Sequence, residues 1–163
     1  MKQVYSSLTH RPGSTNAGIC AIRIAAKEWI SGLILPDFNT GAVVNAIALL
    51  PGFNWLELEF TQPSHELEQT EKENKSGPYF EISYTGIINN MDAALQQSLE
   101  SIKRHQVVAI FTQRNGLKKI IGDTETGMLL KHSNKIVNGS AASEVPVIEL
   151  YIQSENPSTY YNV

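Results

Sequence analysis

The sequence predicts a mainly β fold, a barrel or sandwich of about nine strands with one α-helix packed on the sheet. Two observations favour this class: short apolar or alternating segments follow one another at close spacing, and turn-forming residues separate them. A doubly wound α/β fold is disfavoured, because it needs helices between most strands and only one segment has helical periodicity. The 163 residues are enough to bury one sizeable core, so we expect a single domain over residues 1–163.

The N-terminal part of the chain is predicted to be an arm followed by strands. Residues 1–17 end in a polar, turn-forming run without apolar periodicity, which is typical of a loosely held arm. The β-branched residues between 18 and 35 favour two strands. A turn cluster then leads into a run of apolar residues at 43–50, which ends at Pro51-Gly52 and predicts a buried strand.

Two alternating strands are predicted on either side of the most polar stretch of the chain. In residues 55–61 apolar side chains alternate with glutamates, which leaves Trp55 on the polar face. Residues 78–88 alternate in the same way. The intervening residues 62–76 carry four glutamates and two lysines and have only Leu67 to bury, so we expect a protruding loop or hairpin. Its length favours a functional segment or a flexible one.

The only predicted helix follows the second alternating strand. Asn90 is its expected N-cap, and the helix runs from Met91 to about Arg104 with apolar residues at helical spacing. The next strand, residues 107–112, is apolar on both faces, which predicts cover by the helix on one side and by a sheet on the other.

A hairpin is predicted after this strand, because Asn115-Gly116 between apolar runs favours a type I′ turn. The return strand and the next strand complete an expected three-stranded meander. The remaining segments are, in order, the return strand at 117–122, the third meander strand at 128–132, a polar loop at 133–144, a strand at 145–153 and an aperiodic C-terminal tail at 154–163.

Composition excludes several classes of protein. The net charge of −3 argues against a general nucleic-acid binder, so no specific nucleic-acid binding is expected. The single cysteine excludes an intrachain disulfide and a cysteine-based zinc site, and Cys20 lies in an apolar alternation that predicts a buried thiol. No apolar segment is long enough to span a bilayer, and residues 1–18 lack the apolar stretch of a secretory signal. Neither membrane insertion nor secretion by a signal peptide is expected.

The sequence contains no local motif for catalysis, cofactor binding or metal binding. No nucleophile motif and no phosphate-binding loop is present, and the four histidines are scattered without partners at metal-ligand spacing. The glutamates at 57 and 59 fall on a solvated face, where a general acid–base role has no support. We therefore expect no catalytic residues, no cofactor, no metal and no enzymatic activity, although a site assembled from distant residues leaves no local trace.

Three segments exceed what a monomeric domain needs: the arm at 1–17, the polar excursion at 62–76 and the tail with its two tyrosines. Segments of this kind order on contact with another chain, and strand edges offer pairing sites, so all three could serve assembly. Flexible ends and a flexible loop are the alternative interpretation. The candidate residues for a subunit interface are Trp55, His65, Leu67, Glu71, Tyr160 and Tyr161.

The order of elements over residues 55–152 resembles that of the tail-tube and neck proteins of tailed bacteriophages. The residues behind this resemblance are the polar excursion, the strand Gly-Pro-Tyr-Phe-Glu-Ile-Ser-Tyr, the single helix, the hairpin Arg-Asn-Gly-Leu-Lys-Lys-Ile-Ile-Gly and the strand Gly-Met-Leu-Leu. The resemblance implies a structural subunit of a ring, often of six copies, whose sheets surround a channel. It further implies contacts with other virion proteins and a location in the virion or in the cytoplasm of the producing cell.

A different class of function is the alternative. A monomeric or dimeric β-rich domain could bind a small ligand in a pocket between the helix at 91–104 and the sheet. Tyr84, Trp29 and Phe111 are the candidate lining residues, although large aromatic side chains more often pack in a core. The assembly state in solution distinguishes the two classes, because a structural subunit predicts rings or tubes and a ligand-binding domain predicts a small discrete particle.

Overall fold

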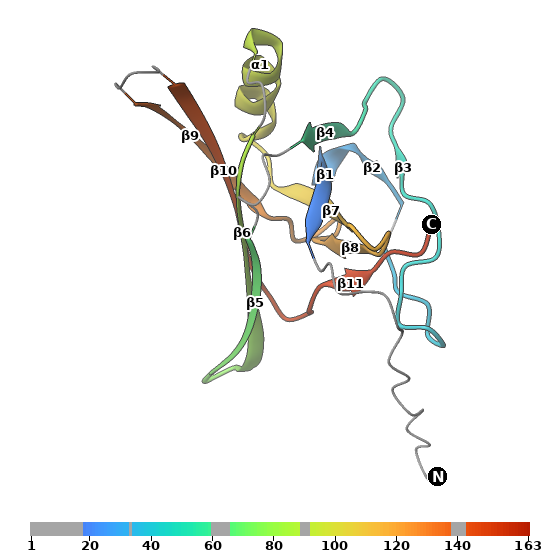
Figure 1. Ribbon diagram of the computed structural model, residues 1–163. Coiled ribbons are helices and arrows are strands. Elements are labelled where there is room, and N and C mark those ends of the chain that lie inside the picture. The colour runs from blue at the N-terminus through green and yellow to red at the C-terminus, as the bar shows by residue number, and fades with distance from the viewer. Residues whose placement is uncertain (1–17, 33, 60–65, 89–91, 138–142) are drawn as a thin grey trace, which may run out of the picture.

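Figure 1 shows the computed structural model, which describes residues 18–32, 34–59, 66–88, 92–137 and 143–163. The described residues form eleven strands, one α-helix and a 3₁₀ turn at Lys27–Trp29. The elements are β1 (Ile19–Ala26), β2 (Ile30–Ser31), β3 (Ala48–Leu49), β4 (Leu56–Glu59), β5 (Glu66–Asn74), β6 (Gly77–Ile87), α1 (Ala93–Ile102), β7 (Val107–Gln113), β8 (Lys118–Ile121), β9 (Leu129–Val137), β10 (Ser143–Ser154) and β11 (Thr159–Tyr160).

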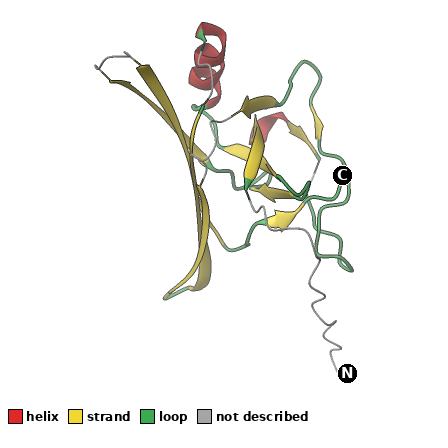
Figure 2. Ribbon diagram, viewed as in Figure 1, coloured by secondary structure: helices red, strands yellow, loops and turns green. Residues whose placement is uncertain are grey.

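The strands form two main sheets that face each other. One sheet has five strands in the order β11-β8-β7-β1-β4, the other has four in the order β5-β6-β10-β9, and β2 and β3 form a separate small pair. All these strand pairs are antiparallel. Figure 2 shows that strands dominate the architecture and that α1 lies at one end of it. The β-rich prediction is confirmed, and the arrangement is sandwich-like because neither main sheet closes on itself.

The main core lies between the two sheets. Strands of both sheets contribute alternate side chains to it, as the period of two along a strand requires. Tyr84 of β6 and Phe111 of β7 meet across the gap, with ring centroids 5.2 Å apart and planes tilted by 55°. The predicted alternation of β6 and β10 is confirmed by the buried residues Ile82, Tyr84, Ile148, Leu150 and Ile152.

A second, smaller core covers the opposite face of the five-stranded sheet. Val108, Ile110 and Ile120 are buried there, and the segment that follows β2 lies over them together with Tyr161. The prediction that β7 would be apolar on both faces is confirmed, but the helix does not provide the second cover. The predicted buried strand at 43–50 is wrong in most of its length. Only Val43, Ala48 and Leu49 pair, and Val44, Asn45 and Ala46 are exposed.

Helix α1 closes the upper end of the gap between the sheets (Figure 1). Leu99 and Ile102 are buried against the main core. The described helix begins two residues later than predicted, because Asp92 is its N-cap and accepts a hydrogen bond from the Leu95 amide at 2.7 Å. The predicted N-cap, Asn90, lies outside the described residues.

The β7–β8 hairpin is present, but its turn differs from the predicted type. The Gly116 amide donates to the Gln113 carbonyl, and the Gln113 amide donates to the Leu117 carbonyl, so the loop has three residues. Gly116 has a φ of 82° at the end of this loop, the position that favours glycine in a three-residue hairpin. The predicted two-residue type I′ turn is therefore wrong.

The predicted three-stranded meander is also wrong, because the chain leaves the five-stranded sheet after β8. Gly122, with a φ of 93°, starts a turn in which the Asp123 carboxylate accepts hydrogen bonds from the Glu125 and Thr126 amides. Met128 still bridges to Val107, but β9 then joins the four-stranded sheet beside β10. Much of the predicted polar loop at 133–144 is strand, since β9 extends to Val137 and β10 begins at Ser143.

Two further differences concern the ends of the described chain. The predicted buried thiol is wrong: Cys20 is exposed, because the pairing of β1 with β7 shifts register between Ile19 and Ala21. The C-terminal segment is held in place, since β11 pairs with β8 and Val43 pairs with Tyr161. The predicted arm at 1–17 lies outside the described residues.

Candidate assembly surface

The outer face of the four-stranded sheet lies away from the main core and has no second layer of buried residues over it among the described elements. One row of paired residues runs across all four strands: Glu66, Thr85, Glu149 and Lys131. The adjacent row contains Leu129, which is 51% exposed, and the half-exposed Tyr151. A shallow depression of about 270 Å³ lies among Ser83, Thr85, Leu129, Lys131, Glu149 and Tyr151. An alternating strand normally places polar residues on such a face, so the two exposed apolar side chains are unusual there.

The two edges of this sheet are matched in length and opposite in charge. Each edge strand has nine residues, β5 at one side and β9 at the other. The sequence of β5 contains four glutamates and one lysine, whereas that of β9 contains two lysines, one histidine and no acidic residue. An edge strand of this length presents a row of unpaired backbone groups to a neighbouring chain.

An ion pair on the outer face fixes β5 to β6. The Lys72 ammonium pairs with the Glu81 carboxylate, and Gln153 of β10 donates to the same carboxylate at 3.2 Å. The hydrogen bond from Lys72 lowers the pKa of Glu81, and the same bond raises the pKa of Lys72. Together, the contacts of Glu81 with Lys72 and Gln153 join three of the four strands.

A second contact ties β5 to the five-stranded sheet. The Gln69 side-chain oxygen accepts hydrogen bonds from the Ser158 amide at 2.9 Å and from the Ser158 hydroxyl at 2.7 Å. Ser158 directly precedes β11, so β5 is attached to the segment that connects the two sheets. Of the two structures predicted for residues 62–76, a loop or a hairpin, the described part is a hairpin with β6.

The candidate interface residues do not gather at one place. Leu67 and Glu71 both lie on β5, where Leu67 packs partly against the main core and Glu71 is exposed. Trp55 and Tyr161 pack partly against the second core, and the Tyr161 hydroxyl accepts a hydrogen bond from the Ile47 amide. Tyr160 is exposed near the Lys119 ammonium. His65 lies outside the described residues.

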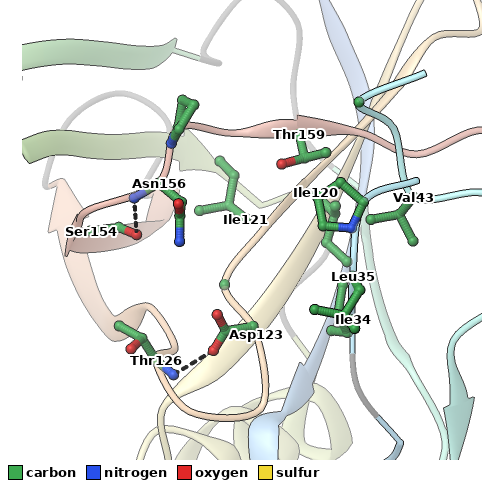
Figure 3. Close-up of a pocket in the computed structure, with 14 residues that line it drawn as sticks. Ile34, Leu35, Val43, Ile120, Ile121, Asp123, Thr126, Ser154, Asn156 and Thr159 are labelled. Atoms are coloured by element: carbon green, nitrogen blue, oxygen red, sulfur yellow. Dashed lines mark hydrogen bonds between the residues drawn. The ribbon is translucent and has the colours of Figure 1, made fainter. Parts of the chain in front are cut away.

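Figure 3 shows a pocket of about 510 Å³ at the lower end of the sandwich. It lies between the segment before β3, the turn after β8 and the link from β10 to β11. Two of its polar groups are engaged within the chain: Asp123 accepts from Thr126, and the Ser154 hydroxyl accepts from the Asn156 amide. Its apolar lining comes mainly from Ile34, Leu35, Val43, Ile120 and Ile121.

Titratable side chains of the described segments form no cluster of three or more that could hold a metal ion. His132 is 8% exposed, and its Nε2 lies 3.2 Å from Glu100 of α1, while its Nδ1 is buried without a hydrogen-bond partner. The hydrogen bond from Lys103 lowers the pKa of Glu100. His105 lies 3.4 Å from Glu28. The contacts of His105 and His132 attach the helix end and the helix to their surroundings. Among the described residues, no helix is long and apolar enough to cross a membrane.

The three aromatic residues predicted to line a ligand pocket lie in two different environments. Tyr84 and Phe111 are fully buried in the main core, where burial raises the pKa of the Tyr84 phenol. Trp29 instead lines a groove of about 550 Å³ between α1 and residues 52–56. No nucleophile beside a base appears among the residues that line this groove. The predicted pocket between the helix and the sheet therefore matches this groove in position and in Trp29, whereas the contribution of residues 52–56 was not predicted.

No family model matches the chain, no curated protein matches it, and no solved structure matches it.

Proposed function

We propose that this chain is a non-enzymatic structural subunit that assembles with copies of itself into a ring. In the proposed contact, β9 of one copy pairs with β5 of the next, so that the four-stranded sheets join into one continuous sheet. The observation that carries the proposal is the pair of matched edges, equal in length and opposite in charge.

Strand direction is compatible with this contact. Neighbouring strands alternate in direction across β5, β6, β10 and β9, so β5 and β9 run in opposite directions. When the next copy is related by rotation about an axis near the strand direction, its β5 lies antiparallel to β9. Such a head-to-tail contact uses two different surfaces and closes into a ring when the rotation closes. A closed ring leaves no free edge on this sheet.

Charge gives the contact its selectivity. Glu66 and Glu68 of β5 and Lys131 of β9 lie on the outer face, as their rows in the sheet show. Pairing two β5 edges would bring glutamates together, and pairing two β9 edges would bring lysines together. Like charges directly opposite each other destabilise a strand pair, whereas opposite charges stabilise it, so the head-to-tail contact is favoured.

The resemblance to phage tail-tube and neck proteins supports the same class of function. On that interpretation the subunit belongs to a virion and contacts other virion proteins at the two ends of the ring. The outer face of the four-stranded sheet, called the bare face below, then lines the interior of the ring. The rest of the subunit lies on the other side of that sheet and has more room on the outside of a ring (Figure 1).

The proposal is tested by reversing the charge of each edge. Lys131→Glu on β9 and Glu68→Lys on β5 should each weaken association by roughly tenfold per contact, since attraction becomes repulsion. Light scattering on a sizing column, with negative-stain images of the largest species, measures the loss of rings. Lys75→Glu is the matched control, because it makes the same charge change in the turn outside both edge strands.

Mixing the two variants gives the decisive result. Lys131→Glu supplies an acidic β9 and Glu68→Lys supplies a basic β5, so an equimolar mixture should recover rings that neither variant forms alone. Carrying both changes in one chain should recover them too. A wild-type chain that stays monomeric at high concentration, or variants that assemble as well as the wild type, would contradict the proposed function.

A further inference from the structure

An exposed phenylalanine is held on a rigid turn at the lower end of the molecule. The Asp37 carboxylate accepts hydrogen bonds from the Asn39 amide at 3.1 Å, the Thr40 amide at 3.0 Å and the Thr40 hydroxyl at 3.1 Å. The backbone closes the same turn, with Gly41 N donating to Asp37 O and Asp37 N donating to Ala42 O. Phe38 at the tip is 100% exposed.

The hydrogen bonds of the turn already fix the backbone at Phe38, so a contact made by this residue loses little further backbone entropy. A preorganised aromatic group can therefore contribute its apolar surface to a contact at little entropic cost. Aromatic anchors of this kind are typical centres of protein interfaces. Leu35, which is 67% exposed and lies on the same segment, enlarges the apolar surface.

A groove of matching character lies at the opposite end of the molecule. It has a volume of about 550 Å³ and runs between α1 and residues 52–56. Trp29, Phe53 and Trp55 supply its aromatic walls. The rings of Trp29 and Phe53 are stacked with their centroids 4.9 Å apart, and Phe53 is 42% exposed. None of its lining residues is charged, and the helix contributes small or neutral polar side chains, including Gln97 and Ser101.

The turn and the groove lie at opposite margins of the same sheet. Residues 37–43 are bonded to the chain beside β11, since Val43 N donates to Tyr160 O. The groove is lined by Leu56 of β4, and β11 and β4 are the two outer strands of the five-stranded sheet. In Figure 1 the segment between β2 and β3 descends to the lower end, whereas α1 and the link from β3 to β4 lie at the upper end.

We infer that Phe38 of one copy inserts into the groove between α1 and residues 52–56 of a second copy. In Figure 1 the strands of the four-stranded sheet run between the lower and the upper end, so this contact runs along them and stacks copies end to end, whereas the β5–β9 contact joins copies side by side. This inference rests on the proposed self-assembly and adds its second direction. A contact between two different surfaces repeats without closing, and stacked rings therefore grow into a tube.

The chemistry of the two surfaces is complementary. An aromatic ring at the tip of the turn meets aromatic walls, where offset or edge-to-face arrangements are favourable. The polar residues Asn39 and Thr40 follow Phe38 in the turn, and Asn54, Gln97 and Ser101 are among the polar residues that line the groove. An apolar centre with a neutral polar rim is the usual anatomy of a protein interface.

The protein contains a built-in reporter for this contact. Trp29 and Trp55 are its two tryptophans, and both line the groove. Tryptophan emission should therefore shift to shorter wavelength as the wild-type protein is concentrated and the groove fills. Phe38→Ala should abolish the shift and stop growth at single rings, measured by sedimentation velocity. Leu117→Ala is the matched control, because it removes an exposed apolar side chain at neither surface.

Cross-linking tests the contact independently of ring formation. In a Cys20→Ser background, Asn39→Cys combined with Ser101→Cys keeps the Phe38 ring and should give a ladder of disulfide-linked chains under mild oxidation. Asn39→Cys combined with Leu117→Cys should give no ladder. A ladder without rings would support the Phe38 contact and contradict the β5–β9 contact. Rings without a ladder, with Phe38→Ala growing as the wild type does, would overturn this inference alone.

Two other occupants of the groove are outcomes that would overturn the inference. Trp emission that responds equally in wild type and Phe38→Ala would show that another segment of the chain fills it. A shift on adding a neutral small molecule such as a linear glucose oligomer, with no shift on concentration, would identify a ligand site instead. A protein that shows no concentration-dependent shift, no ladder and no assembly would refute both this contact and the proposed ring.

Discussion

The two main sheets of this protein differ in how they are covered. The five-stranded sheet has buried side chains on both faces, from the main core on one side and from the second core on the other. The four-stranded sheet has one buried face, and its outer face carries exposed Leu129 and half-exposed Tyr151. Its edge strands are also much longer than β4 and β11, the edges of the five-stranded sheet.

This difference separates the part of the molecule that holds the fold together from the part available for contacts. A sheet with buried side chains on both faces has little freedom to change at its centre without loss of stability, because those side chains are closely packed. A sheet with one bare face and two long charged edges can change its surface residues without disturbing the core. We therefore expect substitutions to affect stability in the first sheet and association in the second.

The largest effect on stability is expected at the centre of the five-stranded sheet. Phe111→Ala removes a fully buried ring that packs against Tyr84, and it should cost about 3–5 kcal/mol of unfolding free energy. Leu129→Ala on the bare face should change it by no more than about 0.5 kcal/mol. Denaturation in urea measures the free energy of unfolding of both variants. Equal losses in Phe111→Ala and Leu129→Ala would contradict the expected difference between the two sheets.

A smaller effect is expected where the chain crosses from one sheet to the other. A Cβ at Gly127 would lie 2.8 Å from Gln106 Cβ and 3.0 Å from the Val107 nitrogen. Gly127→Ala should therefore force the backbone apart and cost about 1–3 kcal/mol. Gly18→Ala meets only the Arg114 side chain at 3.6 Å and should be tolerated. Thermal unfolding of the two variants gives the comparison, and an unchanged midpoint for Gly127→Ala would be inconsistent with this close approach.

The cap of the helix that closes the upper end should have a moderate effect. Asp92→Ala removes the acceptor for the Leu95 amide and should cost about 1 kcal/mol. Asp92→Asn keeps an acceptor at this position and should lose much less. Circular dichroism during urea unfolding measures the difference, and equal losses in the two variants would argue against the capping bond.

The smallest effect is expected on the bare face, as a change in pH dependence. The hydrogen bond from Lys72 lowers the folded-state pKa of Glu81, so its stabilising contribution is present above the unfolded-state value of about 4.5. That contribution is lost as the pH falls through the folded-state pKa. Glu81→Gln should therefore flatten the loss of stability below about pH 5. Wild-type and variant curves that run parallel from pH 6 to pH 3 would show that the pair does not act this way.

Local patterns predicted the sheet faces well and the connections between sheets poorly. Alternation in β6 and β10 depends on neighbouring residues alone, so the buried set could be read from the sequence. The departure of β9 from the five-stranded sheet depends on Gly122 and on the Asp123 turn, which look like an ordinary meander turn in sequence. The strand predicted at 43–50 was wrong because Val43, Ile47 and Leu49 cover the five-stranded sheet mostly without pairing, while Val44, Ala46 and Leu50 are exposed.

The candidate surfaces were predicted only in part. The polar stretch at 62–76 drew attention because it had nothing to bury, and its described part became the acidic edge strand β5. Its basic counterpart, β9, was divided by the prediction into a strand and a polar loop, so the match between the two edges was not visible. Phe38 was not predicted as a surface residue, because Pro-Asp-Phe-Asn-Thr-Gly indicates a turn but does not show which way the aromatic ring points.

The passage of the chain between the sheets has a consequence for how the protein folds. The described chain crosses between the two main sheets four times: after β4, after β6, after β8 and after β10. β1 gains its neighbour β7 only after residue 113 has been synthesised, and β11 adds to its sheet last. Such long-range pairing makes folding slow. The emerging chain therefore exposes its apolar strands until Tyr160 has left the ribosome, and productive folding is expected to depend on protection from aggregation during that interval.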